Sequence, residues 1–434
     1  MVKLKPYAKY KKVDLPWLDK IPEHWGLRNL GRIMKPISAR NRPELPLLSI
    51  TREQGVIVRD IESNENHNYI PDDLSNYKVI EKGQFGMNKM KAWQGSYGIS
   101  KYDGIVSPAY FVFDVEFENL DFFHRALRSP FYVNNFLKAS DGVRIGQWDF
   151  DTAELKRMYI IAPPHPEQTQ IAKYLDRKTE QIDRYIQLKE RQIELLEEQK
   201  TAIINQAVTK GLDPNVPMKD SGIEWLGKIP EHWEMVALKY LYKSNRESLS
   251  ENEDPNLRLN YIDISSVGFG FLKEKPQAFS FGAAPMRARR IVHKGDTIIS
   301  TVRTYLKSIF YITEEHDNCI VSTGFSVLTP TEKINPSISR FLLSSEYFLG
   351  EVLKSSVGVS YPAISNGRLI QIKIPVPPKR EQQETVNYLD TQISKIDTLI
   401  AQTKEKIKTM EELRTSLISS VVTGQLDVRK VSLD

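Results

Sequence analysis

Two segments of the chain each place a basic side chain two residues before an aromatic one. In QFGMNKMKAWQGS the pair is Lys91 and Trp93, and in DTIISTVRTYLKS it is Arg303 and Tyr305. A cation can neutralise a phosphate or bind the major-groove edge of guanine, while an aromatic ring packs on a sugar or a base. The spacing therefore indicates contact with nucleic acid, although a solvated charged strand with core aromatic residues would show the same pattern.

A second loop in each half of the chain offers polar and aromatic side chains of the same kind. These loops are DGVRIGQWDF at 141–150 and SVGVSYPAIS at 356–365, and their glycines would allow the backbone close to a duplex. Such side chains can reach base edges in the major groove. With the first segments and the neighbouring lysines, they make the candidate DNA contacts Lys89, Lys91, Trp93, Arg144, Gln147, Trp148, Arg303, Tyr305, Lys307, Ser360 and Tyr361.

The chemistry of a self-sufficient enzyme is missing from the sequence. There is no Walker-type phosphate loop, no Asn-Pro-Pro-aromatic tetrapeptide of the amino-methyltransferases, and no acidic pair followed by Glu-x-Lys, as in nucleases. The seven histidines are scattered, and His24 and His232 have no companion at metal-ligand spacing. We therefore expect no active site, cofactor or metal in this chain, and we expect both histidines to pack beside Trp25 and Trp233.

The composition is that of a mildly basic globular protein. The 434 residues carry 60 Lys and Arg against 55 Asp and Glu, a net charge of +5, which permits a nucleic-acid partner without requiring one. This length allows two or three domains. No apolar run approaches the ~18 residues of a membrane span, the N-terminus lacks the apolar core of a signal peptide, and one cysteine excludes a disulfide framework. We expect a cytoplasmic protein with no membrane partner.

The motif KIPEHW at residues 20–25 recurs at 228–233, and further motifs recur in the same order. Matching positions differ by 208 residues at KIPEHW (20 and 228), 212 at Lys-Gly (82 and 294), 215 at Ile-Val-Ser (105 and 320) and 214 at Pro-Pro (163 and 377). A preserved order with a slowly drifting offset is typical of two copies of one unit that differ by loop insertions. The chain therefore contains an internal repeat, and KIPEHW marks the start of each copy.

Each copy has a strand-rich part followed by a helical part. Short apolar runs such as DTIISTV and IVSTGFSVL alternate with Gly, Pro and Asn, and a helical pattern over 121–138 lies among them. Pro-Pro then opens a long stretch with a helical period. We predict an α+β fold with two β-rich domains and two long helices, divided as 1–162 (domain), 163–212 (helix), 213–376 (domain) and 377–428 (helix).

The two long helices share an apolar stripe with alternating spacings of three and four residues, in which Thr403 and Arg414 fill the remaining positions of the second helix. The stripe consists of Leu175, Thr179, Ile182, Ile186, Ile193, Leu196, Ile203 and Ala207 in the first helix, and of Leu389, Ile393, Ile396, Ile400, Ile407, Met410, Leu417 and Val421 in the second. A stripe sustained over several heptads is typical of a coiled-coil seam. We predict an antiparallel coiled coil with a domain at each end and approximate two-fold symmetry; two separate helices, each on its own domain, are the alternative.

These motifs in combination resemble the specificity subunit of type I restriction–modification enzymes. The resemblance rests on WLDKIPEHW and SGIEWLGKIPEHW before the domains, PPHPEQTQIAKYLD and PPKREQQETVNYLD at the start of the helices, and AVTKGLDPNVPMKDSGIEWLG and LRTSLISSVVTGQLDVR at their ends. It covers the whole chain. The segment before the first domain, KYKKVDLPWLDK, differs in sequence from the corresponding DSGIEWLG segment of the second copy, so different packing is expected there.

The resemblance implies that each globular domain is a target-recognition domain, which reads one half of a bipartite asymmetric site in double-stranded DNA. The helices would set the spacer between the half-sites and dock two modification subunits, which bind S-adenosylmethionine and methylate adenine. Separate restriction subunits would use ATP and Mg²⁺ to translocate and cut DNA. Two other hypotheses stay open: a coiled-coil scaffold whose domains bind protein rather than DNA, and a self-sufficient nuclease.

Overall fold

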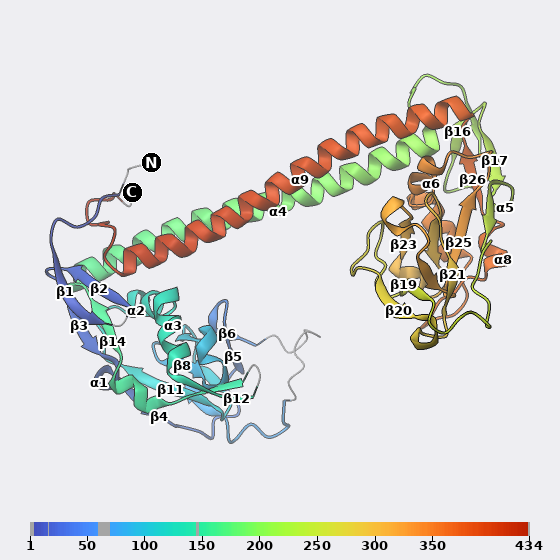
Figure 1. The fold of residues 1–434 in the computed structure, drawn as a ribbon. Coiled ribbons are helices and arrows are strands. Elements are labelled where there is room, and N and C mark those ends of the chain that lie inside the picture. Colours follow the sequence, from blue (N-terminus) through green and yellow to red (C-terminus); the bar gives the residue numbers. More distant parts are fainter. Residues whose placement is uncertain (1–3, 16, 60–69, 145–146, 433–434) are drawn as a thin grey trace. The chain divides into compact units, whose positions relative to one another are not determined.

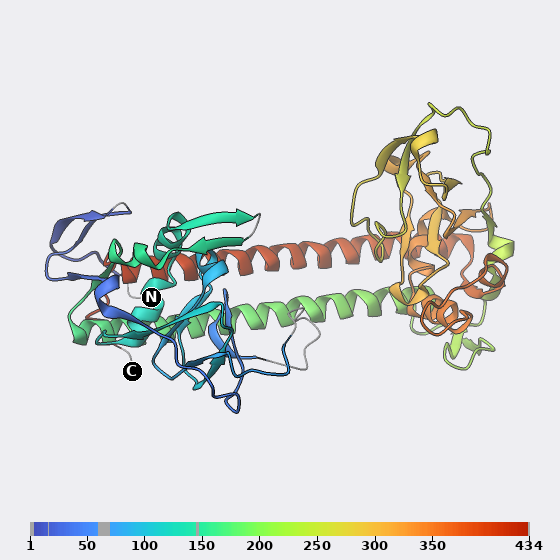
Figure 2. The same cartoon turned by 90° about the horizontal axis from the view of Figure 1, so that it is seen from below.

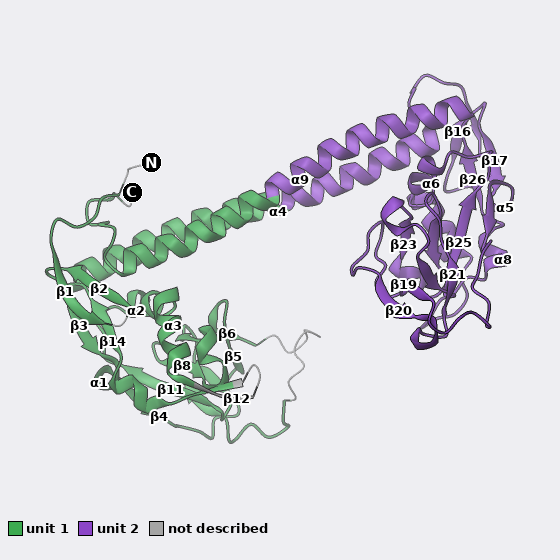
Figure 3. Cartoon of the chain, viewed as in Figure 1, with its two compact units in different colours: residues 1–190, 404–434 green, residues 191–403 purple. Residues whose placement is uncertain are grey.

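The computed structural model describes residues 4–15, 17–59, 70–144 and 147–432, without the side chains of 141–144 and 147. It separates into two compact units, residues 1–190 with 404–434 and residues 191–403 (Figure 3). Each unit contains one globular domain and one half of each of two long helices, α4 (His165–Lys210) and α9 (Lys379–Val422). Within the described ranges, none of the helices combines the length and the apolar character that crossing a membrane needs.

The domain of unit 1 is built on a four-stranded antiparallel sheet (Figure 1). Side chains of its central strands, among them Phe85, Met87 and Phe113, are completely or almost completely buried. They share one core cluster with Phe122 and Phe123 of a covering helix, so the burial of aromatic rings holds helix and sheet together. The strand order is β4 (Met34–Ile37), β11 (Tyr110–Val115), β8 (Phe85–Asn88) and β9 (Tyr97–Ile99).

The helical pattern predicted over 121–138 forms two helices, α2 (Leu120–Leu127) and α3 (Pro130–Lys138). Pro130 prevents α2 and α3 from forming one continuous helix because it has no backbone N–H. It occupies the first turn of α3, where proline is favoured. The side chain of Asn119 caps α2 by accepting a hydrogen bond from the backbone N–H of Phe122. Both helices contribute buried aromatic residues to the core of unit 1.

Smaller strand pairs and short helices complete unit 1. The helical turns are α1 (Leu30–Ile33), η1 (Lys89–Gln94) and η2 (Thr152–Lys156). The antiparallel pairs are β1 (Tyr10–Leu15) with β2 (Leu18–Pro22), β3 (Gly26–Asn29) with β14 (Tyr159–Ala162), β5 (Leu48–Thr51) with β6 (Gly55–Val58), β7 (Lys78–Ile80) with β10 (Gly104–Val106), and β12 (Ser140–Arg144) with β13 (Gln147–Phe150).

Unit 2 repeats the central sheet and the strand pairs next to the helices. Its central sheet, β18-β25-β22-β23, corresponds to β4-β11-β8-β9, and the pairs β15–β16 and β17–β26 correspond to β1–β2 and β3–β14. The strands are β15 (Met218–Asp220), β16 (Lys228–Pro230), β17 (Glu234–Ala237), β18 (Tyr242–Ser244), β22 (Thr297–Ser300), β23 (Ile309–Tyr311), β25 (Phe325–Pro330) and β26 (Lys373–Val376). The predicted internal repeat is therefore confirmed.

The second sheet of unit 2 is more regular than its counterpart in unit 1. It has the order β20 (Gln277–Ser280), β19 (Arg258–Ile262), β24 (Ile320–Ser322) and β21 (Ala288–Ile291), with β19 and β24 parallel. In unit 1 the isolated parallel bridge between Leu47 and Ile105 joins the two corresponding strand pairs. The remaining helical elements are α5 (Leu238–Leu241), η3 (Phe281–Ala283), η4 (Thr304–Leu306), η5 (Glu314–His316), α6 (Pro336–Leu342), α7 (Glu346–Lys354) and α8 (Asn366–Leu369).

The long helices α4 and α9 pack on each other in both units. All residues of the predicted stripe except Arg414 are buried or half-buried, Leu175 and Leu389 completely so. Arg414 pairs with Asp183 at 3.5 Å in unit 1, and Lys200 pairs with Asp397 at 2.7 Å in unit 2. The residue numbers of the two pairs have the same sum, as antiparallel helices require. The predicted antiparallel coiled coil is confirmed, and the alternative of two separate helices is wrong.

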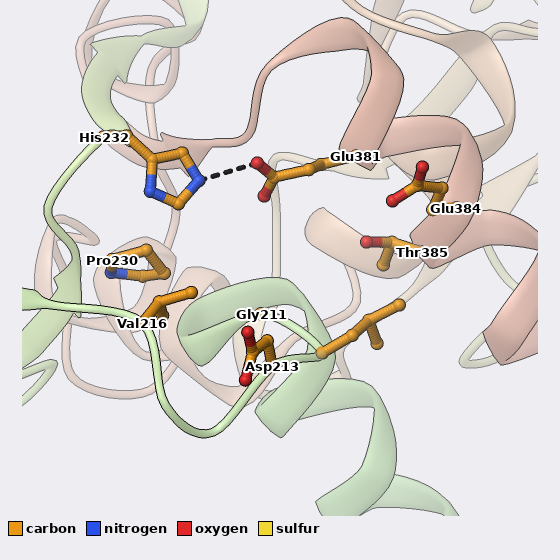
Figure 4. A pocket seen from close by; sticks show the side chains of 9 residues that line it. Gly211, Asp213, Val216, Pro230, His232, Glu381, Glu384 and Thr385 are labelled. Carbon is orange, nitrogen blue, oxygen red and sulfur yellow. Dashed lines mark hydrogen bonds and ion pairs between the residues drawn. The ribbon is translucent and has the colours of Figure 1, made fainter.

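The repeated KIPEHW motif of unit 2 lies where the domain meets the first turn of α9. Trp233 is completely buried, and its Nε1 donates a hydrogen bond to Oε2 of Glu381 (2.9 Å). His232 Nε2 contacts the other oxygen of the same carboxylate at 2.7 Å, beside a cavity of about 230 Å³ (Figure 4). A carboxylate in the first turn also interacts favourably with the helix dipole. His232 therefore packs beside the tryptophan as expected, and Glu381 is a partner that the sequence did not reveal.

Unit 1 builds the same contact with different partners. Trp25 is again completely buried, and His24 Nε2 contacts Oε2 of Glu167, in the first turn of α4, at 2.8 Å. The hydroxyl of Tyr7 takes the place of the indole N–H and donates to Oε1 of Glu167 (2.5 Å). The guanidinium of Arg429 lies 4.9 Å from the centre of the Tyr7 ring. The start of unit 1 therefore packs differently from the start of unit 2, through Tyr7, which lies two residues before the edge at 9–20.

The repeated Pro-Pro and Glu-Gln residues are parts of the same start of the helix. Gln168 Nε2 donates to the carbonyl of Pro163 (2.8 Å), and Gln382 Nε2 donates to the carbonyl of Pro377 (2.9 Å). Both glutamines are almost completely buried. Each side chain therefore ties the first turn of its helix back to the strand that leads into it, because a buried amide needs a hydrogen-bond partner.

The repeated Tyr-Leu-Asp motif attaches the long helix to the domain a second time. Asp176 of α4 forms an ion pair with Arg125 of α2, and Asp390 of α9 forms one with Arg340 of α6. The sequence motifs that the two copies share therefore lie mainly at the joint between domain and helix. A joint held at several points fixes the direction in which each domain leaves its helix.

Removing the Glu381 carboxylate should loosen this joint. Glu381→Ala leaves the buried indole N–H of Trp233 without its acceptor, so we expect the free energy of unfolding to fall by about 1–3 kcal/mol. Glu381→Gln keeps one acceptor oxygen and should cost less than half of this. The control is Glu384→Ala, which removes an exposed carboxylate one turn further on. Urea unfolding measures the difference; equal effects of Glu381→Ala and Glu384→Ala would show that the joint does not depend on this contact.

Candidate nucleic-acid interface

In unit 1 the two candidate segments lie against each other. The turn η1 connects β8 to β9, and the rings of Trp93 in η1 and Trp148 in β13 are 5.7 Å apart and tilted by 31°. Lys89 forms an ion pair with Asp149 of the same strand (2.6 Å). Lys91 is exposed beside these contacts. The β12–β13 hairpin extends from the edge of the domain (Figure 2).

The ends of η1 are fixed by polar contacts. Asn88 caps its start by accepting a hydrogen bond from the backbone N–H of Met90, and Gly95 ends it with a φ of 87°. Arg128 donates hydrogen bonds to the carbonyls of Gly95 (3.0 Å) and Tyr97 (2.7 Å). The same guanidinium also donates to two carbonyls of the turn between β5 and β6. One arginine therefore positions η1 and a neighbouring turn together.

His124 of α2 packs against β9, the strand that follows η1, and its protonation is expected to make the stability of unit 1 depend on pH. Its Nδ1 accepts a hydrogen bond from the backbone N–H of Ile99 (3.0 Å). Burial, followed by the charges of Arg128, Arg125 and Lys101, lowers the pKa of His124 from its usual 6.5 to about 3. The folded chain thus keeps the ring neutral at a pH where the unfolded chain protonates it. The stability that this contributes is present above pH 6.5 and is lost as the pH falls towards 3.

We expect the free energy of unfolding of unit 1 to fall by about 2 kcal/mol between about pH 7.5 and 5 because of His124. His124→Gln retains an acceptor for Ile99 but does not titrate, so the variant should lose most of this pH dependence. Urea unfolding at the two pH values, followed by a probe in unit 1, measures the effect. An unchanged pH dependence in the variant would assign it to other groups.

In unit 2 the corresponding segments also meet. The turn η4 connects β22 to β23, as η1 connects β8 to β9. The backbone N–H of Thr304 donates to the carbonyl of Pro362 (3.2 Å), and its hydroxyl bonds the hydroxyl of Ser356 (2.9 Å). The guanidinium of Arg303 lies over the Tyr361 ring, 5.2 Å from its centre, which suits a cation–π contact.

The backbone on both sides of η4 is strained. Arg303 and Lys307 each have a φ of 50°, in the left-handed region of backbone conformation that residues other than glycine rarely adopt. Such residues cost roughly 1–3 kcal/mol each and cluster at functional sites. The conformation presents exposed side chains on a tight turn: Arg303, Tyr305, Leu306 and Lys307. Ser360 and Tyr361 are exposed on the adjoining loop.

The second candidate segment has a different form in each unit. Residues 141–150 were expected to form a loop, but the structure has the β12–β13 hairpin there, since Trp148 and Phe150 alternate with polar residues and pair with the preceding strand. Residues 356–363 form an irregular loop that is closed by a bridge between Val357 and Ala363. Arg144 and Gln147 were predicted contacts, and their side chains lie outside the described residues.

The comparisons with known proteins agree with one another. Residues 230–409 match the family model of the type I restriction modification DNA specificity domain. A putative type I restriction enzyme MjaX specificity subunit of Methanocaldococcus jannaschii is 24% identical over 99% of this chain and 100% of its own length. Because the match extends over both copies of the internal repeat, it accounts for the part that the family model leaves out. The chain is therefore similar to type I specificity subunits over almost its whole length.

Further proteins match over shorter parts of the chain. The MjaVIII specificity subunit of the same organism is 27% identical, and the match covers 65% of each chain, so this chain spans about two thirds of that relative. Two solved structures share the fold. One is described as the structural basis of complex assembly and conformational transition of the type I R-M system (TM-score 0.69, 18% identity, 94% and 99% of the chains covered), and the other is the HsdS subunit of Thermoanaerobacter tengcongensis (TM-score 0.52, 18% identity, 94% and 98%).

The cations predicted to contact DNA differ in whether an acidic residue already pairs with them. Lys91, Arg303 and Lys307 are exposed, and none of them has an ion-pair partner among the residues that the structure describes. Lys89 is already paired with Asp149, which offsets part of its attraction for a phosphate. Across the described ranges, no cluster of three or more His, Cys, Asp and Glu could hold a metal ion.

Sequence reasoning missed one segment next to η4. Residues 263–276 connect β19 to β20, whereas three residues, 52–54, make the same connection between β5 and β6 in unit 1. Neither copy has a repeated basic and aromatic pair in this connection, so the motifs did not predict a DNA contact there. The signal that could have found it is the length difference between the copies, which marks an addition to one domain alone.

Proposed function

We propose that the chain is the DNA-recognition subunit of a type I restriction–modification complex, and that each globular domain reads one half of a bipartite asymmetric site. The domains span 1–162 and 213–376. One observation carries the proposal: in both copies a short turn between matching strands meets a second segment, a hairpin in unit 1 and a loop in unit 2, yet the side chains on this surface differ. The proposed DNA contacts are Lys89, Lys91, Trp93, Arg144, Gln147, Trp148, Arg303, Tyr305, Lys307, Ser360 and Tyr361.

The long helices, at 163–212 and 377–428, set the spacer and bind two modification subunits in this proposal. Their seam is filled, but leucines on their outer faces stay exposed: Leu188, Leu195, Leu399 and Leu413. In unit 1 a groove of about 830 Å³ on the helices is lined by Tyr174, Ile182, Met410, Leu413 and Leu417. Apolar surface of this extent favours a protein partner.

The catalytic chemistry belongs to partner subunits in this proposal. Modification subunits bind S-adenosylmethionine and methylate an adenine, which must leave the base stack to be reached. Restriction subunits use ATP and Mg²⁺. This chain binds no cofactor; it holds phosphates and reads base edges, which position and specify a site.

The proposal is tested with the complex of this chain and its modification subunits. The complex should retain a duplex that carries both half-sites at the correct spacing, and it should release duplexes in which either half-site is scrambled. Equal retention of scrambled duplexes, with the complex intact, would favour the coiled-coil scaffold. Cleavage of DNA by this chain alone with Mg²⁺ would instead favour the self-sufficient nuclease.

A further inference from the structure

Unit 2 carries a small hairpin in the connection between β19 and β20, where the corresponding connection of unit 1 has three residues, 52–54. Within residues 263–276, which connect β19 to β20, Val267 and Leu272 form an isolated antiparallel bridge. The backbone N–H of Gly268 donates to the carbonyl of Phe271 (2.9 Å), and Gly270 turns the chain with a φ of 80°. Val267 is completely buried in the core of unit 2. The base of the hairpin is therefore fixed, and its tip lies at the surface.

The hairpin is attached to the start of β23, just after η4. Gly270 N–H donates to the carbonyl of Ile309 (2.8 Å), and Ile309 N–H donates to the carbonyl of Gly268 (3.1 Å). These two bonds form the parallel bridge between Phe269 and Ile309. Since Lys307 precedes Ile309 by two residues, the tip stands beside the proposed DNA-binding turn.

The tip presents two aromatic side chains to solvent. Phe269 is 47% exposed and Phe271 is 55% exposed. The Phe271 ring packs over Gly268, where even a Cβ atom would come within 2.8 Å of the ring, so its direction is restricted. Tyr305 and Leu306 of η4 are each 50% exposed. Exposed apolar side chains on a fixed support mark a binding surface.

The charges near the hairpin indicate which kind of partner its tip would bind. Arg303 and Lys307 are exposed, have no ion-pair partner among the described residues, and flank η4, the turn just before the strand that the hairpin contacts. The two cations can bind a partner with a negatively charged backbone, and the apolar tip can contact apolar groups that lie between the charges of that partner. Double-stranded DNA has both, because thymine methyl groups line its major groove between the phosphates.

We infer that the 267–272 hairpin is a specificity element of the second domain, and that Phe269 and Phe271 contact thymine methyl groups in the half-site read by that domain. The inference rests on the proposed function. Because unit 1 connects the same strands by three residues, its half-site lacks this contact. The hairpin therefore helps the two domains to read different sequences from one shared frame.

The experiment uses the complex with modification subunits and duplexes in which deoxyuridine replaces thymine in one half-site, which removes only the methyl groups. The wild-type complex should bind about three- to ten-fold more weakly when the half-site of the second domain is substituted. Phe269→Ala/Phe271→Ala should bind the thymine duplex about as weakly, with no further loss on substitution. Substitution in the other half-site should affect both complexes equally.

Tyr240→Ala is the matched control, because it removes an exposed aromatic side chain of unit 2 that lies on α5 rather than on the hairpin; it should bind as the wild type does. Wild-type affinity of the double variant, or a full thymine dependence in it, would overturn the inference. Failure of the proposed function looks different, because the wild-type complex would then not distinguish the bipartite duplex from a scrambled one.

Discussion

Arg303→Glu is expected to weaken the binding of duplex DNA by the modification complex on the order of ten-fold to a hundred-fold. Arg303 is exposed, is held in a strained conformation at the start of η4, and is oriented by the Tyr361 ring. Reversal of its charge replaces attraction to a phosphate by repulsion. If the contact is to a phosphate, the dependence of affinity on salt should also become shallower by about one unit in the logarithmic slope.

Lys91→Glu is the equivalent change in unit 1, and together with Arg303→Glu it should abolish specific retention. Lys89→Ala should have a smaller effect, because Asp149 already pairs with Lys89. Lys239→Glu is the matched control, since it reverses an exposed charge on α5 of unit 2. Equal losses from Lys239→Glu and Arg303→Glu would mean that only net charge matters, and the proposed surface would be wrong.

One added heptad in each long helix is expected to lengthen the spacer between the half-sites by about three base pairs and to leave both half-site sequences unchanged. Seven residues add about 10 Å of helix, and three base pairs of B-DNA span the same length. Seven residues also come within about 20° of two full turns, so the apolar stripe keeps its direction.

The insertion must be made at opposite points of the antiparallel pair. Counted from the ion pair between Lys200 and Asp397, a repeat of residues 187–193 placed after Ile193 lies opposite a repeat of 397–403 placed after Thr403. Glu190→Gln with Glu405→Gln, which changes exposed charges without changing length, should leave the spacer as it is. Methylation assays on duplexes with spacers of increasing length give the answer. A longer coiled coil with an unchanged spacer would contradict the role of the helices.

The repeat and the coiled coil were predictable from the sequence, because residue order and local spacing decide them. The stripe that contains Leu175 and Leu389 depends only on residue spacing, and helices of this period must bury it. Trp25 and Trp233 could be expected to anchor each copy because both domains repeat the same surroundings. The carboxylates of Glu167 and Glu381, which complete the joint, could not be assigned, since their partners lie about 145 residues away.

The candidate interface was predictable only in part. The positions of Lys91 and Arg303 followed from the alignment of the two copies. The contact of Trp93 with Trp148, the pairing of Lys89 with Asp149 and the hairpin at 267–272 could not be predicted in this way, because contacts between distant segments depend on the packed domain. Length differences between the copies carry more information about specificity than the shared motifs do, since shared motifs build the common frame.

The central claim is that this chain selects the DNA site, and a map of modified adenines in the source organism tests it most directly. With the gene intact, one bipartite motif should be modified throughout the genome. That motif should become unmodified when this gene alone is deleted, and it should change in one half only when residues 213–376 are exchanged for the second domain of a relative. A modified motif that persists unchanged after either alteration would contradict the account.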